Sequence, residues 1–159
     1  MGAQDEATFG LLPLIARGWA RKGSKPIVTI NSKHECINVF GARTKRAFVY
    51  AFAKRKTQRE FTRFLSKLQR QWNRVLLFVD NGPCHHGKIV DKFLAEHRKT
   101  FKLRYFLKYT PELNPTEQCW KPARKALANR VLRTLPAAQY HLRKTFNNAK
   151  GLPKYFQYL

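Results

Sequence analysis

The chain has 159 residues and a mass of 18.7 kDa, a length that suits one domain with its own hydrophobic core. Its 43% hydrophobic and 13% aromatic content excludes a disordered basic tail. The 32 Lys and Arg residues outnumber the 9 Asp and Glu residues and give a formal net charge of +23. This charge favours a polyanionic partner such as nucleic acid. A ribosomal-type structural protein and a basic protein that is merely soluble are the alternatives on charge alone.

The sequence argues against a membrane partner. The apolar run at residues 75–79 is far shorter than the roughly 20 residues that a membrane-spanning helix needs. The first residues lack the basic start and apolar core of a signal peptide. The three cysteines, Cys36, Cys84 and Cys119, are odd in number and have no CxxC spacing, which favours reduced thiols in a cytoplasmic protein.

The first half of the chain predicts a hairpin followed by a helix. Residues 27–30 are a candidate short strand, and alternating side chains predict a strand over residues 36–40. After a turn near residues 41–46, residues 47–52 read as the hairpin partner. Apolar residues then recur at spacings of three and four up to Trp72, which is typical of an amphipathic helix with Thr57 as its N-cap.

The second half predicts alternating strands and helices. The continuous apolar run 75–79 is typical of a central strand covered on both faces. A turn, a helix over residues 86–97 and a strand over residues 103–107 follow. Asn114 opens a helix that runs to about residue 130, and Thr134 with Pro136 opens a last helix ending near residue 151. This order predicts a mixed α/β fold whose sheet has an antiparallel side and a parallel side.

Three of the scarce acids stand at positions where chemistry is often found. Asp80 follows an apolar strand, at the edge where open α/β sheets bind ligands, although an Asx turn explains it equally well. Glu117 lies three residues after Asn114, a spacing that by itself favours a capping box. Asp5 adjoins Glu6, and neighbours on a strand point to opposite faces, so only one of them is expected to join a shared site.

Four stretches match the motifs of one family. They are Gln4-Asp5-Glu6 with Phe9, RGWARKG at residues 17–23, LFVDNGPCH at residues 77–85, and YTPELNPTEQCW at residues 109–120. The last two are the specific ones: a strand that ends in Asp-Asn, and a Pro-x-Leu-Asn-Pro-x-Glu-x-x-Trp signature. Together they resemble the catalytic domain of DDE transposases of the mariner superfamily and of related bacterial and archaeal insertion sequences.

The resemblance implies a ribonuclease H-like fold, a mixed five-stranded sheet flanked by helices, over a single catalytic domain of residues 1–159. No helix-turn-helix DNA-binding segment is expected within these residues. Only four residues precede Asp5, so the first strand is expected to be truncated or completed by another segment. Carried over by position, the family's catalytic and metal-binding triad falls on Asp5, Asp80 and Glu117.

The implied activity is metal-dependent cleavage and transfer of DNA strands at transposon ends. Two Mg²⁺ or Mn²⁺ ions can stabilise the attacking and leaving oxygens of the phosphodiester, and hard cations prefer carboxylate ligands. Asp80 would bridge both ions, and Asp5 and Glu117 would each complete one shell. The alternatives are a catalytically inactive, basic DNA-binding remnant and another ribonuclease H-like nuclease, such as a junction resolvase or a hybrid nuclease.

The implied partners are transposon-end DNA and target DNA, bound by a homodimer that is associated with the nucleoid. An upstream polypeptide that reads DNA sequence is a further candidate partner. Non-specific phosphate contacts position DNA without reading its bases. The candidates for nucleic-acid contact are Arg21, Lys22, Asn81, His85, Asn114, Lys121, Arg124 and Lys125. For His85, a purely structural role is an equal alternative.

Overall fold

The computed structural model describes residues 1–12, 14–27, 29, 32–107 and 114–148. Its elements in chain order are β1 (Gly2–Gly10), β2 (Cys36–Arg43), β3 (Phe48–Ala53), α1 (Gln58–Trp72), β4 (Val75–Val79), the short 3₁₀ helix η1 (Pro83–His85), α2 (Lys88–Glu96), β5 (Phe101–Tyr105), α3 (Glu117–Leu127) and α4 (Leu135–Phe146).

The five strands form one mixed sheet in the order β3-β2-β1-β4-β5. β1 pairs antiparallel with β2, and β2 with β3, while β1 pairs parallel with β4, and β4 with β5. The predicted combination of an antiparallel and a parallel side is therefore confirmed. β1 is the middle strand, and β4 lies between it and the edge strand β5.

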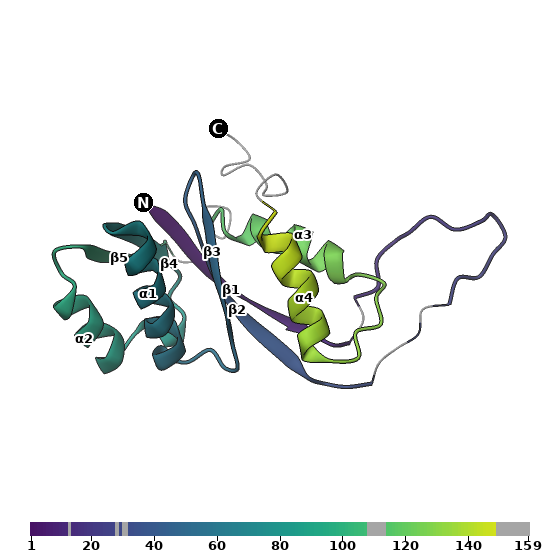
Figure 1. Cartoon of the computed structure of the whole chain (residues 1–159), viewed down its shortest axis with the longest axis horizontal. Coiled ribbons are helices and arrows are strands. Elements are labelled where there is room, and N and C mark those ends of the chain that lie inside the picture. Colours follow the sequence, from purple (N-terminus) through teal and green to yellow (C-terminus); the bar gives the residue numbers. More distant parts are fainter. Residues whose placement is uncertain (13, 28, 30–31, 108–113, 149–159) are drawn as a thin grey trace.

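Helices cover both faces of the sheet (Figure 1). On one face, α1 and α2 bury Phe61, Leu65 and Val90 against Phe40 and Leu77 of the sheet. On the other face, α3 and α4 bury Trp120, Leu142 and Phe146 against Ala7 and Phe9 of β1. Each large apolar side chain buried in this way contributes about 1.5–3 kcal/mol. The two cores hold the sheet rigidly between them, so β1 is a firm base for side chains on either face.

The first strand is not short. β1 has nine residues and pairs with β2 from Ala3–Arg43 to Gly10–Cys36, so the expected truncation is corrected along that side. Along β4, its parallel pairing comprises only Gly2–Leu77 and Ala3–Phe78. β1 then continues beyond the end of β4, so among the described residues no strand pairs with that side of β1 from about Asp5 onwards.

Most element ends follow their sequence signals. Thr57 caps α1 by accepting a hydrogen bond from the Glu60 amide at 3.3 Å, and Thr134 caps α4 by accepting one from the Ala137 amide at 3.4 Å. The hairpin differs, because β2 runs to Arg43 and the turn is confined to residues 44–47. In the candidate strand 27–30, Ile27 and Thr29 are not in a strand, and residues 28 and 30 lie outside the described residues.

Two predicted helices begin or end elsewhere. α3 begins at Glu117 rather than Asn114, because Asn114 forms a preceding turn in which its Oδ1 accepts the Thr116 amide at 3.1 Å. α4 ends at Phe146, and the predicted end near residue 151 lies outside the described residues, as does the 109–113 part of the signature. Within the described ranges, no helix has the length and apolar character required to cross a bilayer.

Candidate active site

Carboxylates from two neighbouring strands meet where β4 ends and β1 continues. Asp80 directly follows Val79, the last residue of β4, and Asp5 and Glu6 lie in the part of β1 beside it. One carboxylate oxygen from each of the three acids lies within 4.8 Å of the others. The structure thus brings Asp5 and Asp80 together, as the sequence motifs predicted.

Asp5 faces the α3–α4 side of the sheet. Its Oδ2 accepts a hydrogen bond from Nε1 of Trp120 at 2.7 Å. Burial is the main reason why the pKa of Asp5 is raised to about 7, the Trp120 bond opposes this shift, and the charges of Glu6 and Glu117 add to it. A nearby cation would remove the cost of this buried charge.

Bonds between β1 and the turn before α3 hold the start of α3, where Glu117 lies, against β1. Nδ2 of Asn114 donates to the Gln4 carbonyl at 3.1 Å, and Oγ1 of Thr116 donates to the Ala3 carbonyl at 2.8 Å. Glu117 is the next residue and the first of α3, and its charge raises the pKa of Asp5. The structure therefore places Glu117 near Asp5, but not in the group of Asp5, Glu6 and Asp80 whose oxygens lie within 4.8 Å of one another.

Glu6 also joins this group, which corrects the prediction that only one of the adjacent acids would do so. Asp5 and Glu6 do point to opposite faces, since Glu6 contacts His85 of η1 at 2.6 Å while Asp5 contacts Trp120 of α3. Because β4 has ended at this level, no strand separates the two faces, and both carboxylates reach Asp80.

His85 connects Glu6 with Asp80. Its Nδ1 lies 2.9 Å from both Oδ1 and the carbonyl oxygen of Asp80. Burial alone would lower the pKa of His85, but its hydrogen bonds to Asp80, Cys84 and Glu6 outweigh this and raise the pKa far above its usual value. The His85 bond in turn holds the pKa of Asp80 below its usual value, so Asp80 is charged at neutral pH.

The donor set suits a hard divalent cation. Asp5 and Asp80 offer carboxylate oxygens within 4.8 Å of each other, and such cations prefer oxygen ligands. Gln4, fully buried beside Glu6, has an Oε1 with no hydrogen-bond partner among the described residues. A carboxyl whose pKa is raised by burial, as at Asp5, is one whose charge a neighbouring cation would stabilise.

Two of the predicted nucleic-acid contacts are corrected. The His85 side chain is fully buried between two acids, and Asn114 is buried with both of its amide atoms bonded to the backbone. Neither can reach DNA, so both are structural parts of the site. The other six predicted residues are exposed: Arg21 and Lys22 in the β1–β2 segment, Asn81 after Asp80, and Lys121, Arg124 and Lys125 on α3.

Four residues of the site were not assigned a role from the sequence. Glu6 was set aside by the alternation rule, and Gln4 and Gly82 give no signal of their own. Trp120 stands in the quoted signature, but only the structure shows that its indole reaches Asp5. Ring packing fixes this indole: its centroid lies 6.2 Å from that of Phe9 and 5.9 Å from that of Phe146.

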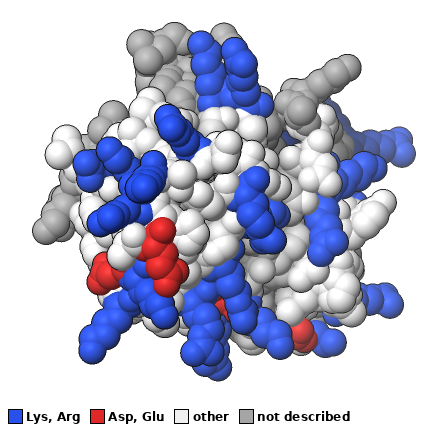
Figure 2. Space-filling view, turned by 60° about the vertical axis from the view of Figure 1, so that its left-hand side comes forward, with Lys and Arg blue, Asp and Glu red and all other residues white. Residues whose placement is uncertain are grey.

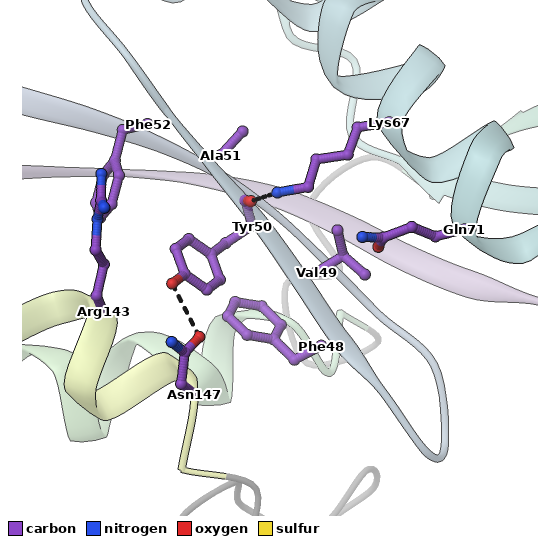
Figure 3. Close-up of a pocket in the computed structure, with 9 residues that line it drawn as sticks. All are labelled: Phe48, Val49, Tyr50, Ala51, Phe52, Lys67, Gln71, Arg143 and Asn147. Atoms are coloured by element: carbon purple, nitrogen blue, oxygen red, sulfur yellow. Dashed lines mark hydrogen bonds between the residues drawn. The ribbon is translucent and has the colours of Figure 1, made fainter.

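A hollow of about 630 Å³ lies away from these acids, along the outer edge of β3 (Figure 3). Tyr50 and Phe52 of β3 point into it, and Lys67 of α1 and Arg143 of α4 flank it. Nζ of Lys67 donates to the Tyr50 carbonyl at 2.7 Å, which protects a backbone group of this edge strand in the way that lysines often blunt sheet edges. We therefore assign the hollow a structural role.

Positive charge dominates the surface that Figure 2 shows. Figure 2 shows Lys and Arg side chains distributed over one whole face of the molecule, with only a few acidic groups among them. Residues 118–148, which include most of α3 and all of α4, contain seven Lys and Arg residues and no Asp or Glu. The acidic cluster at the end of β4 is thus a local exception in an electropositive protein.

Comparison with known families decides the identity of the domain. Residues 2–138 match the model of the DDE superfamily endonucleases. The chain belongs to this family. No curated protein sequence matches the endonuclease domain.

Solved structures of Mos1 transposase share the fold of this DDE endonuclease. The Mos1 strand transfer complex has 18% identity and a TM-score of 0.71, covering 98% of this chain and 49% of the Mos1 chain. The Mos1 mariner paired end complex with Mn has 16% identity and a TM-score of 0.71, covering 97% and 52%. The Mos1 catalytic domain alone has 15% identity and a TM-score of 0.66, covering 92% and 69%.

The likeness confirms the predicted ribonuclease H-like fold. The DDE endonuclease chain spans about half the length of the Mos1 chains in the DNA complexes that it matches.

Proposed function

We propose that this chain is the catalytic domain of a transposase, which cleaves DNA at transposon ends and transfers the resulting strands. The observation that carries the proposal is the convergence of Asp5 and Asp80, whose oxygens lie within 4.8 Å, with Glu117 close enough to raise the pKa of Asp5. Membership of the DDE endonuclease family supports the reaction class.

Asp5, Asp80 and Glu117 would hold two Mg²⁺ or Mn²⁺ ions. Such ions stabilise the attacking and leaving oxygens of a phosphodiester during displacement. Mos1 structures with Mn and with Mg support this choice of ion. In this chain, Asp80 contributes a carboxylate that stays charged because His85 binds it, and Asp5 contributes one whose proton is easily displaced near neutral pH.

The partners would be transposon-end DNA and target DNA. The Mos1 structures include a paired-end complex with the left transposon end, which supports a homodimer that holds two ends. In this chain, Lys121 and Arg124 follow Glu117 by four and seven residues, so they share its side of α3. Both are exposed, and we infer that they contact the phosphates of the DNA that enters the site. Action on chromosomal DNA would place the protein in the cytoplasm at the nucleoid.

A cleavage assay with Asp80→Asn tests the proposed function. Wild-type protein with Mn²⁺ is expected to nick DNA that carries the transposon ends, whereas the variant should lose at least 100-fold in rate (about 3 kcal/mol). Binding of DNA, measured by fluorescence anisotropy, should be retained, because Asp80→Asn removes a negative charge and so does not weaken the attraction to DNA phosphates. Equal cleavage by both proteins would contradict the site assignment.

The same assay separates the alternatives. Preferential cleavage of an RNA–DNA hybrid over duplex DNA would favour a hybrid nuclease. A complete lack of metal-dependent cleavage, together with DNA binding that is intact, would favour the inactive remnant.

A further inference from the structure

His85 is a buried bridge between two acids on different strands. Its Nε2 lies 2.6 Å from Oε1 of Glu6 on β1, and its Nδ1 lies 2.9 Å from Oδ1 of Asp80 at the end of β4. We propose that Glu6 and His85 form a buried clamp that sets the orientation of the Asp80 carboxylate for metal binding. The proposal rests on the proposed function, in which Asp80 is a metal ligand, and it makes Glu6 and His85 positioning residues.

Glu6 is bound in a way that suits a positioning role. Its side chain is only 8% exposed, whereas that of Asp80 is 55% exposed. One oxygen, Oε1, receives the Gln4 amide at 2.8 Å and the His85 ring at 2.6 Å, and the Cys84 thiol lies 3.7 Å away. A carboxylate with several donors on one buried oxygen has a fixed rotamer, so it can orient the imidazole that binds it.

The imidazole is fixed from other sides as well. The Phe61 ring of α1 packs on it with a centroid distance of 4.5 Å. The His85 backbone amide donates to the Gly82 carbonyl at 3.0 Å, and Tyr105 of β5 donates to the His85 carbonyl at 3.3 Å. Since ring and backbone are both held, the direction of Nδ1 is determined by the fold rather than by Asp80 itself.

Gly82 completes the clamp on the Asp80 side. Its amide donates to Oδ1 of Asp80 at 2.8 Å, so the same oxygen receives two donors. Two donors on Oδ1 fix the rotation of the carboxylate and thereby the direction of Oδ2. A Cβ at residue 82 would lie 2.9 Å from Oδ1 of Asp80 and 3.4 Å from the His85 ring. Glycine is therefore required here for space, since its φ of −59° is open to any residue.

In this proposal, two successive residues of β1 have different roles. Asp5 faces α3 and is itself a proposed ligand, while Glu6 faces η1 and positions the ligand on the next strand. Partners that orient metal ligands typically change metal affinity or activity by 10–100-fold when they are removed. An effect of this size separates a positioning pair from an ion pair that only supports the fold.

The test measures Mn²⁺ binding without DNA, by electron paramagnetic resonance of the free ion. Glu6→Ala and Gly82→Ala are each expected to raise the dissociation constant for Mn²⁺ by about 10-fold or more. Glu6→Gln keeps an oxygen acceptor for His85 and should restore most of the affinity. The double variant Glu6→Ala/Gly82→Ala should bind Mn²⁺ only slightly more weakly than the single variant with the lower affinity, because both changes disrupt the same clamp. Matched controls are Glu96→Ala, an exposed acid on α2, and Gly10→Ala.

The outcomes are distinguishable from a failure of the proposed function. Unchanged Mn²⁺ affinity in Glu6→Ala and Gly82→Ala, with binding lost in Asp80→Asn, overturns the clamp and leaves the metal site. Full binding by Asp80→Asn overturns the metal site instead. If Glu6→Gln is as damaged as Glu6→Ala while Gly82→Ala is normal, Glu6 is a ligand and the clamp is wrong. Should Glu6→Ala fail to fold by circular dichroism, Gly82→Ala and Glu6→Gln still decide.

Discussion

The charge of Asp5 lowers the stability of the folded protein, although the proposed function requires that charge for metal binding. Its side chain is half-buried, and burial together with the charges of Glu6 and Glu117 raises its pKa to about 7 from an ordinary value of 3.8. Between these two pH values the folded protein retains a proton that the unfolded chain has released. The contribution of Asp5 to stability therefore falls as pH rises through this range, by at most about 4 kcal/mol, and stays at the lower level above pH 7.

Asp5→Asn is expected to stabilise the metal-free protein. In EDTA, the free energy of unfolding of the variant should exceed that of wild type by a few kcal/mol at pH 8, with a smaller difference at pH 5. Asparagine removes the buried charge and still offers an oxygen to Nε1 of Trp120, which donates to Asp5 at 2.7 Å. Urea denaturation from pH 5 to 8 measures the difference.

Two further measurements define this effect. Asp91→Asn, an exposed acid on α2, is the control for loss of one negative charge. Adding Mn²⁺ should reverse the order at pH 8, since only wild type retains the full ligand set and gains binding energy. A stability difference that is constant with pH would show that Asp5 does not titrate as described.

Glu6 and Gly82 show why the residue scale was only partly predictable. The triad positions could be proposed because each stands in a motif, and the structure brings Asp5 and Asp80 together with Glu117 near Asp5. Glu6 could not, because alternation along a strand describes side chains within a sheet, whereas Glu6 lies where the neighbouring strand has already ended. Gly82 reads as an ordinary turn glycine, and its tight fit against Asp80 is a three-dimensional property.

At the scale of elements, capping and periodicity predicted helices well and strands less well. α1 and α4 begin one residue after their predicted threonine caps. β1 gives no clean alternation because Gln4, Asp5 and Glu6 in its middle are polar residues that serve the site. β2 was predicted to end near Phe40 because Gly41 suggests a turn, yet the strand continues to Arg43.

Gly41 lies in β2 because of space, as it is the register partner of Asp5 on the face covered by Trp120. A Cβ at this position would lie 2.5 Å from Cη2 of Trp120 and 2.9 Å from the Phe48 ring. Gly41→Ala is therefore expected to destabilise the protein by about 1–3 kcal/mol. It should also weaken Mn²⁺ binding, because the indole that holds Asp5 must move. Urea denaturation and Mn²⁺ titration measure the two effects.

Gly10→Ala is the matched control for this substitution. Gly10 ends β1, and its Cβ would meet nothing closer than 3.8 Å, so the change should be neutral or stabilise slightly. Equal losses in the two variants would show that Gly41 is required for a reason other than the packing of Trp120.

For DNA binding by the whole molecule, the positions of the charged residues matter more than the total charge. Any protein with a net charge of +23 binds polyanions, and the salt dependence of that binding reflects the number of phosphates contacted. The proposed function makes specific residues contact the DNA phosphates, namely Lys121 and Arg124, which lie on the Glu117 side of α3. Arg98 and Lys99 are also exposed, but they precede β5, which runs parallel to β4, and so lie at the opposite end of these strands from Asp80.

Two double charge reversals use this geometry. Lys121→Glu/Arg124→Glu and Arg98→Glu/Lys99→Glu change the net charge equally, yet only the first pair is expected to remove phosphate contacts at the site. Its affinity for a DNA duplex at 0.1 M salt should fall by about 10-fold or more, and the slope of log K against log salt should become shallower by about two. The second pair should leave the slope nearly unchanged. Equal losses of DNA affinity in the two double variants would mean that binding depends only on total charge. Contact of DNA with α3 requires Lys121→Glu/Arg124→Glu to have the larger effect.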